Sequence, residues 1–183
     1  RPTPDPAVFM QFLPRIKQNT DAVINITTGG GAGMTVQERL AAPLKAKPEV
    51  CSCNMGSMNF GLYPMLDRYK SFKHDWEPQM LEGSHDLVFR NSFKDIRYAL
   101  ETLNGSGARY EFECYDTSHL YNLHYFWTDG LVKAPLFIQT CFGLLGGSSN
   151  RRMPCSWTVA SKTPMNSAPP STWMARTGNG IRS

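Results

Sequence analysis

The chain has 183 residues, of which 41% are hydrophobic and 11% aromatic, which suits one globular domain with a sizeable core. No stretch approaches the ~20 apolar residues of a membrane-spanning helix, so we expect no membrane partner. The formal net charge is +4, but residues 1–147 hold 14 Lys+Arg and 15 Asp+Glu, so the basic excess lies entirely in residues 148–183. The body of the chain therefore gives no electrostatic reason to expect a nucleic-acid partner.

Residues 148–183 differ in composition from the rest of the chain. They contain no Leu, Phe, Tyr, Asp or Glu, and their Ser, Thr, Pro, Asn and Met residues show no helical or strand period. Such a segment buries too little apolar area to offset the backbone entropy of ordering, about 1–2 kcal/mol per residue. We expect no compact fold there. The segment is either a genuine disordered extension or the product of a truncation or frame shift near Gly146 and Gly147.

The five cysteines form no recognisable framework. Their number is odd, no C-x-x-C pair is present and no signal peptide opens the chain. We expect reduced thiols in a cytoplasmic protein. Cys51 and Cys53 share a strand face but lack a third metal ligand, so packing in the core is the favoured interpretation.

Helical and strand patterns alternate along the body of the chain. Apolar spacing predicts helices over residues 6–18, 35–47, 92–104 and 118–132, and buried strands over residues 22–28, 49–54, 110–115 and 136–142. Asp5 is placed to cap the first helix, and capping-box patterns open the second and third. Regular alternation with short buried strands indicates a parallel sheet with right-handed crossovers.

An open doubly wound sheet and a closed barrel share this alternation. Polar residues at the C-terminal end of every predicted strand favour the barrel. So does the long connection over residues 60–91, whose aromatic side chains indicate an ordered lid. About four βα units are present, half of an eightfold barrel. We therefore predict an α/β fold in which residues 1–147 form a partial TIM (β/α)8 barrel, a catalytic domain with parallel strands.

Two glycine-bearing segments end the first two predicted strands. They read VINITTGGG at residues 23–31 and VCSCNMGSMNFG at residues 50–61. Strands that end in small hydroxyl, amide and glycine residues build ligand sites in α/β proteins. Thr27, Thr28 and Gly30 could hold a carboxylate, although a tight turn also requires glycine for conformation alone. Ser57 and Asn59 can both reach a ligand at the strand end, or serve the turn alone.

Glu111 and Glu113 alternate with apolar residues, so both carboxylates point to one face of their strand, which in a barrel is the interior. Buried carboxylates are uncommon unless they are paired or bind a metal. These two are therefore either catalytic residues or partners of basic groups such as Arg109. The four histidines lack the spacing of a metal pair and are interpreted as surface or capping residues.

Five segments resemble the beta-keto acid cleavage enzyme family, typified by the 3-keto-5-aminohexanoate cleavage enzyme. They are INITTGGG at residues 24–31, PEVCSCNMGSMNFG at 48–61, NSFKDI at 91–96, YEFECYD at 110–116 and PLFIQ at 135–139. The resemblance covers residues 1–147 and not residues 148–183. It implies a zinc-dependent TIM barrel, homo-oligomeric in its full-length form, that converts a beta-keto acid and acetyl-CoA into acetoacetate and a new acyl-CoA. It also implies that Thr27, Gly30, Ser57 and Asn59 position the acid.

The resemblance further implies where the zinc ligands lie. The family holds zinc through a His-x-His pair on an early strand and a Glu late in the barrel, and neither is present here. The opening RPTPD resembles the stretch after the His pair, so we expect the ligands before Arg1 and beyond Gly147. The chain is interpreted as an internal fragment that is inactive alone. The alternatives are a non-catalytic truncated remnant and an unrelated TIM-barrel enzyme that binds phosphate at its glycines, without the lysine of a P-loop.

Overall fold

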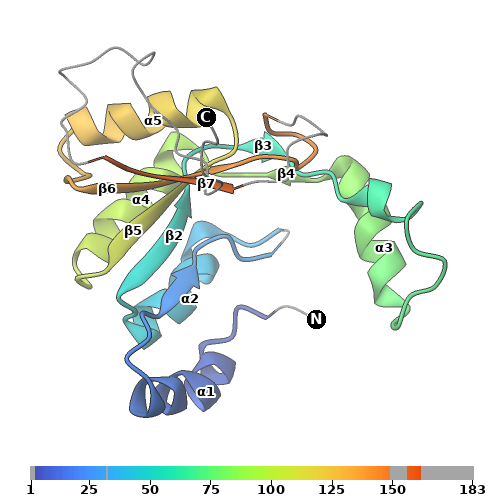
Figure 1. The fold of residues 1–183 in the computed structure, drawn as a ribbon, viewed down its shortest axis with the longest axis horizontal. Helices are drawn as coiled ribbons and strands as arrows, with labels where there is room; N and C mark the ends of the chain where they lie inside the picture. The colour runs from blue at the N-terminus through green and yellow to red at the C-terminus, as the bar shows by residue number, and fades with distance from the viewer. Residues whose placement is uncertain (1–2, 32, 149–155, 162–183) are drawn as a thin grey trace, which may run out of the picture.

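The computed structural model describes residues 3–31, 33–148 and 156–161, and Figure 1 shows their arrangement. The main sheet has the strand order β1-β2-β5-β6-β7. These strands are β1 (Asn25–Thr27), β2 (Val50–Asn54), β5 (Arg109–Cys114), β6 (Leu136–Cys141) and β7 (Ser156–Ser161). The first four run parallel to one another, as predicted, whereas β7 runs antiparallel to β6.

The helices are α1 (Pro6–Asn19), α2 (Val36–Ala46), α3 (Trp76–Gly83), α4 (Phe93–Asn104) and α5 (Thr117–Thr128). Asp5 and Asp116 cap α1 and α5 by accepting backbone N–H groups of the first turn. Both predicted capping boxes are present, at the starts of α2 and α4. The chain leaves α2 at Lys47, whose left-handed φ of 48° ends the helix just before Pro48.

The helices α2, α4 and α5 cover one face of the sheet. Cys53 of β2 and Phe112 of β5 belong to a core cluster with Leu100 of α4 and Phe126 of α5, and a second cluster joins α2 to α4 and β2 around Leu40. A doubly wound sheet carries helices on both faces and reverses its strand order. Here the parallel strands follow chain order without reversal. The fold is therefore α/β and corresponds to part of a TIM barrel, as predicted.

The long connection between β2 and α4 is ordered. It contains η1 (Tyr63–Met65), α3 and η2 (Ser84–Asp86), enclosed by β3 (Met58–Asn59) and β4 (Val88–Phe89), which pair antiparallel. In Figure 1 α3 lies on the right, on the opposite side of the molecule from α5 and α1. Tyr63 stacks on His85 with 3.5 Å between the ring centroids, which fixes η1 against η2. The β3–β4 pair brings the Phe60 and Phe89 rings together, with 6.4 Å between their centroids.

Residues 156–161 form β7, a regular strand within the segment for which no compact fold is expected. The strand pairs with β6 from Leu136 opposite Ser161 to Cys141 opposite Ser156. Backbone pairing with a neighbouring strand does not depend on apolar periodicity, which explains why composition does not reveal it. The expected disorder or frame shift of the remaining residues of this segment lies outside the described residues.

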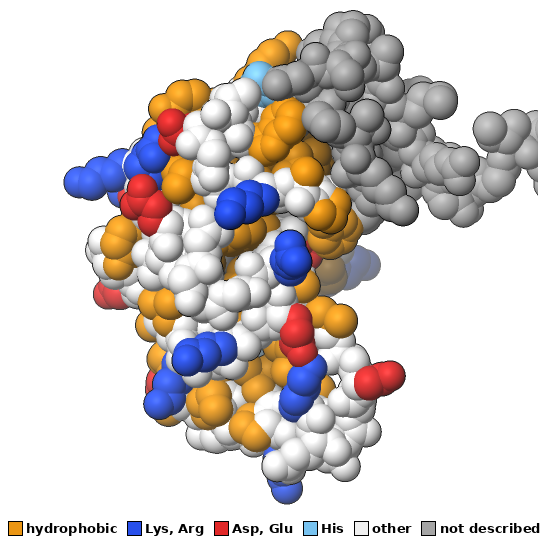
Figure 2. Space-filling model, turned by 90° about the vertical axis from the view of Figure 1, so that its left-hand side faces the viewer, with side chains coloured by type: hydrophobic (Ala, Val, Ile, Leu, Met, Phe, Trp, Pro, Cys, Tyr) orange, Lys and Arg blue, Asp and Glu red, His pale blue; other side chains and the backbone are white. Residues whose placement is uncertain are grey.

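The surface shown in Figure 2 carries basic and acidic side chains interspersed with apolar ones. This distribution agrees with the near balance of charges in residues 1–147. Within the described ranges, no helix has both the length and the apolar character needed to cross a membrane.

Candidate active site

The sheet face opposite the helices carries polar side chains. On β2, Cys53 points to the helices, so Ser52 and Asn54 point to the other face. The alternation along β5 places Glu111 and Glu113 on that same face, as expected from the sequence. The register sets Ser52 beside Glu111 and Asn54 beside Glu113. Two polar rows therefore cross the open face of the sheet.

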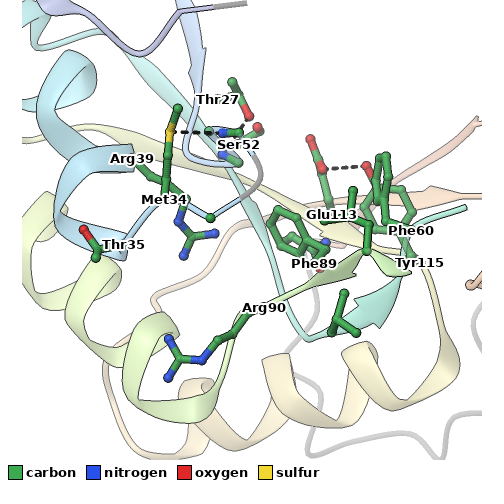
Figure 3. Close-up of a pocket in the computed structure, with 17 residues that line it drawn as sticks. Thr27, Met34, Thr35, Arg39, Ser52, Phe60, Phe89, Arg90, Glu113 and Tyr115 are labelled. Carbon is green, nitrogen blue, oxygen red and sulfur yellow. Dashed lines mark hydrogen bonds between the residues drawn. The ribbon is translucent and has the colours of Figure 1, made fainter. Parts of the chain in front are cut away.

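A pocket of about 600 Å³ opens at the carboxyl ends of β1, β2 and β5 (Figure 3). Its lining comes from the strand ends, from the glycine loop (residues 29–31 and 33), from aromatic and aliphatic side chains of the long connection, and from Arg39 and Arg90. A concave site with apolar walls and a few convergent polar groups is typical of a small-molecule site.

The first glycine segment brings Thr27 and Gly30 into the pocket lining but not Thr28. Thr27 Oγ1 accepts the Gly29 N–H at 3.0 Å. Gly30 has a φ of 63°, and a Cβ there would lie 2.4 Å from Cγ of Arg39, so both conformation and space require glycine. Thr28 is buried, and its hydroxyl donates to a β2 carbonyl at 2.8 Å. Thr28 therefore fastens β1 to β2 and does not face the pocket.

Of the two candidate carboxylates, Glu113 lines the pocket and Glu111 does not. Glu113 Oε2 accepts the hydroxyl of Tyr115 at 2.9 Å. Burial, with the neighbouring Glu113 charge, raises the pKa of Tyr115, so its hydroxyl stays a donor. Glu111 Oε2 accepts from the carboxamide of Asn25. None of the ion pairs among the described residues includes either glutamate, so Arg109 is not their partner in this part of the chain.

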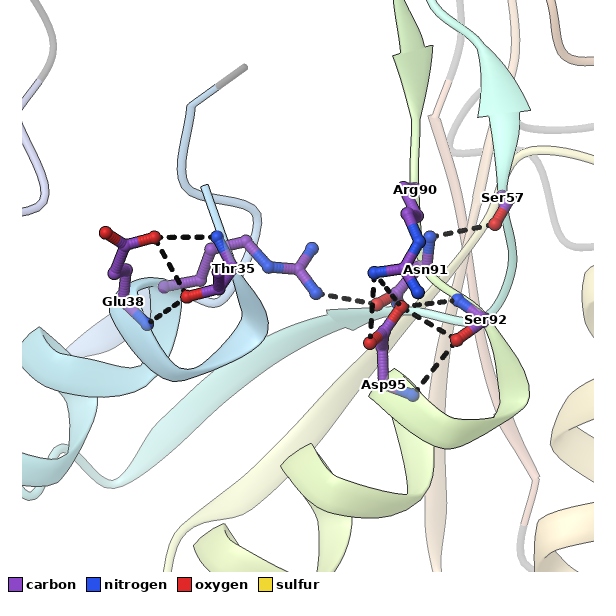
Figure 4. Close-up of polar contacts among 8 residues, drawn as sticks. Thr35, Glu38, Ser57, Arg90, Asn91, Ser92 and Asp95 are labelled. Atoms are coloured by element: carbon purple, nitrogen blue, oxygen red, sulfur yellow. Dashed lines mark hydrogen bonds and ion pairs between the residues drawn. The ribbon is translucent and has the colours of Figure 1, made fainter. Parts of the chain in front are cut away.

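Ser57 and Asn59 lie outside the pocket lining, and both side chains are exposed. Ser57 Oγ accepts the backbone N–H of Asn91 at 2.8 Å (Figure 4), which is the turn role considered as the alternative. Asn59 belongs to β3 and pairs with Val88 of β4. Contact between these residues and a substrate stays a prediction.

The sequence patterns do not single out Arg39, yet it is one of the two cations in the pocket wall. Its side chain is 7% exposed on α2, and its guanidinium lies 5.5 Å from the centroid of the Phe89 ring. Nη2 donates to Asn91 Oδ1 at 2.8 Å, whereas Nε has no partner. Burial lowers the pKa of Arg39. One signal could have identified it: Arg39 stands three residues after Val36 and four before Pro43, on the buried stripe of α2.

Asn91 joins the two sides of the pocket, and the sequence patterns do not single it out either (Figure 4). The residue is 5% exposed. Its Oδ1 accepts from Arg39, its Nδ2 donates to the Asn54 carbonyl and its N–H donates to Ser57. Asn91 thereby fixes α2 against the end of β2 with a carboxamide whose oxygen and nitrogen both have partners.

The described residues do not form a zinc site by themselves, because no group of three or more His, Cys, Asp or Glu side chains among them could hold a metal ion. Cys51 and Cys53 are free and buried, and burial raises their pKa to about 11 and about 12, which confirms their role in the core. His119 is buried and not on the surface. Its Nδ1 accepts the Tyr115 N–H at 3.1 Å.

The site has the layout of a TIM-barrel enzyme. Active sites of such enzymes lie at the carboxyl ends of the parallel strands, in the loops that follow them. The chain belongs to the beta-keto acid cleavage enzyme family, whose model matches residues 1–179. The match continues beyond residue 147, so the change in composition there does not mark its end.

Three curated relatives illustrate the similarity. The chain is 62% identical over 146 residues to the 3,5-dioxohexanoate:acetyl-CoA acetone transferase of Paraburkholderia graminis, covering 80% of the chain and 47% of the relative. It is 23% identical over 183 residues to the 3-dehydrocarnitine:acetyl-CoA trimethylamine transferase of Rhizobium meliloti, covering 84% and 54%. It is 28% identical over 149 residues to the 3-keto-5-aminohexanoate cleavage enzyme of Acetoanaerobium sticklandii, covering 81% and 46%. The chain therefore spans about half the length of these relatives.

Proposed function

We propose that this chain is the pocket-bearing part of an enzyme that converts a beta-keto acid and acetyl-CoA into acetoacetate and a new acyl-CoA. The observation that carries the proposal is the 62% identity to the Paraburkholderia graminis transferase over 146 residues, which is 80% of the chain. On that identity, the proposed substrate is 3,5-dioxohexanoate or a close analogue. The volume of about 600 Å³ and the mixture of polar strand ends with apolar walls suit an acid of that size.

The proposed reaction exchanges the two parts of the acid. The carbon–carbon bond between C2 and C3 breaks, and the two-carbon acid unit joins the acetyl group of acetyl-CoA to give acetoacetate. Coenzyme A takes up the remaining acyl group. From 3,5-dioxohexanoate, the second product is acetoacetyl-CoA.

The pocket residues of this chain suit positioning and proton transfer. We assign Thr27, Ser52 and Asn54 to hydrogen bonding with the acid, because all three border the pocket at the strand ends. We assign Glu113 to proton transfer at C2, since it is the described carboxylate in the lining and Tyr115 holds it in place. In the complete protein, zinc would act as a Lewis acid on the keto group, with ligands that we propose lie outside this chain.

A chimaera tests the proposal. Residues 1–147 replace the matching segment of the Paraburkholderia graminis transferase, and acetoacetate formation from 3,5-dioxohexanoate and acetyl-CoA is measured. We expect turnover in the chimaera, and a loss of roughly 100-fold or more in kcat with Glu113→Gln, as expected for removal of a general acid or base. Glu101→Gln, at an exposed position of α4, serves as the matched control. A folded chimaera without turnover, or equal rates for both variants, would contradict the assignment.

The 183-residue chain alone gives the complementary measurement. We expect it to retain less than one zinc ion per chain after dialysis and to show no turnover, because tight zinc sites require three or four protein donors. Metal content is read by elemental analysis and turnover by acetoacetate formation. Stoichiometric zinc or measurable turnover in the isolated chain would refute the proposal that the ligands lie elsewhere.

A further inference from the structure

Arg39 is a buried cation that has no carboxylate within ion-pair distance among the described residues. Its side chain is 7% exposed, and none of the ion pairs among the described residues includes it. Its polar partner is the neutral carboxamide of Asn91, and the Phe89 ring lies beneath the guanidinium. Burial of a guanidinium costs free energy unless an anion compensates its charge. Burial lowers the pKa of Arg39, whereas the charge of Asp95 raises it and so compensates part of this cost, and an anion from another molecule would supply a direct partner.

The guanidinium borders the pocket at the start of α2 (Figure 3). Nε is buried and has no acceptor among the described residues, so one N–H of the planar fork is unpaired. Gly30 lies against the stem of Arg39 so closely that no other residue fits there, which places the glycine loop beside the cation. The first turn of α2 borders the lining at Thr35, but the Glu38 carboxylate of the capping box already accepts the Thr35 N–H, so the donors for an anion come from Arg39 and the glycine loop. These features favour an anion at one point.

Arg90 provides a contrast within the same pocket. Its side chain is 71% exposed, and Nη1 lies 3.2 Å from a carboxylate oxygen of Asp95. A solvated arginine with an acidic partner has no need of a further anion. Arg90 therefore has a carboxylate within ion-pair distance, whereas Arg39 has none among the described residues. This difference makes Arg39 the candidate for binding an anion.

We propose that Arg39 is an anion-binding residue of the pocket, which receives a carboxylate or phosphate oxygen beside the glycine loop. A guanidinium binds either group with two N–H donors, which fixes orientation as well as charge. The anion would come from the carboxylate of the acid substrate or from a phosphate of coenzyme A. The inference rests on the proposed function for the identity of the anion. Anion binding is measured without turnover, so the anion site and the proposed reaction can be refuted separately.

The test is calorimetric titration of the 183-residue chain with acetoacetate and, separately, with adenosine 3′,5′-bisphosphate. Arg39→Gln should raise the Kd of one probe by roughly 10- to 100-fold, as expected for the loss of a charged hydrogen bond. Arg39→Lys keeps the charge but not the planar fork of N–H donors, so its Kd should lie between those of the wild type and Arg39→Gln. Arg15→Gln, at an exposed position of α1, should change the Kd less than twofold. An effect on acetoacetate indicates the acid carboxylate as the source, and an effect on the bisphosphate indicates coenzyme A.

Thermal unfolding separates binding from a purely structural role. Without anion, Arg39→Gln should change Tm little, because the glutamine carboxamide can still donate to Asn91, while the rise in Tm caused by the probe should vanish. A lower Tm with an unchanged Kd, or a wild-type chain that binds neither probe, would overturn the proposal. Where a variant of the isolated chain does not fold, the same titration is made in the chimaera. A chimaera that binds the anion through Arg39 but does not turn over would sink the proposed reaction and leave this inference standing.

Discussion

The two faces of the parallel sheet have opposite characters although they share the same strands. On β5, Phe112 and Cys114 are 2% and 3% exposed beneath the helices. Glu111 and Glu113, their neighbours in sequence, project to the open face, where Glu113 borders the pocket. A strand turns successive side chains to opposite sides, so the six residues of β5 contribute both to the core and to the lining of the pocket. Substitutions on the two faces should therefore affect different measurements.

The largest loss of stability is expected on the helix-covered face. Phe126 of α5 is fully buried and packs in the main core cluster. Phe126→Ala should lower the free energy of unfolding by about 3–5 kcal/mol, because it leaves a cavity between α4 and α5. Urea unfolding followed by far-UV circular dichroism gives the value. Tyr121→Ala, on the same helix but 66% exposed, should cost no more than about 0.5 kcal/mol. Similar costs for the two variants would mean that the helices do not pack on this face as described.

The second loss concerns the buried capping box of α4. Asp95 is 5% exposed, and its Oδ2 accepts from the N–H and the hydroxyl of Ser92. Asp95→Ala should cost about 1–3 kcal/mol, since the half-buried N–H and hydroxyl of Ser92 lose their acceptor. Glu38→Ala, in the fully exposed capping box of α2, should cost less. Chemical unfolding of both variants at pH 7 tests this order, and the reverse order would contradict it.

Asp95 also makes the stability of the fold depend on pH, and the sign of this dependence can be predicted. Burial raises the pKa of Asp95, but the Ser92 hydrogen bonds and the charges of Arg90 and Arg39 outweigh burial, so the pKa falls below its ordinary value of 3.8. A carboxyl group with a depressed pKa stabilises the fold above its unfolded pKa and loses that contribution as pH falls through the folded value. The stability difference between wild type and Asp95→Ala should therefore be constant from pH 7 to about 5 and shrink below about pH 4.

The regular features of this fold follow from local sequence. Capping residues, apolar stripes and strand alternation act within a few residues, so they locate the helices and set Glu111 and Glu113 on one face. The pocket wall depends instead on contacts between distant segments. Arg39 meets Asn91 across 52 positions, and β3 and β4 have two residues each, too few to show a period. Thr28 and Thr27 look alike in sequence, and the register with β2 decides which one faces the pocket.

A further test concerns His119, which is buried in the first turn of α5. Burial lowers its pKa below 6.5, so the folded protein holds it neutral while the unfolded chain takes up a proton. Stability should then be complete above about pH 6.5 and decline as pH falls through the folded value. Urea midpoints at pH 7.5 and 5.5 should differ less in His119→Asn than in wild type. His74→Asn, at an exposed position, should keep the wild-type difference. If His119→Asn kept the wild-type difference between the two urea midpoints, groups other than His119 would cause the pH dependence of stability.

The smallest loss of stability is expected on the open face, the sheet face opposite the helices. Substitutions there should lower kcat more than they lower the free energy of unfolding. Glu111→Gln keeps an acceptor for the Asn25 carboxamide and should change the free energy of unfolding by no more than about 0.5 kcal/mol. Both carboxylates are catalytic candidates from sequence, but the pocket borders Glu113 and not Glu111. In the chimaera, Glu111→Gln should therefore lower kcat by less than tenfold, well short of the roughly 100-fold expected for Glu113→Gln. Equal losses of kcat in the two variants would mean that Glu111 also takes part in the reaction. The pocket of the chimaera would then include both carboxylates. A stability loss of several kcal/mol in either variant would instead mean that the open face is part of the core, and the division between the two faces would fail.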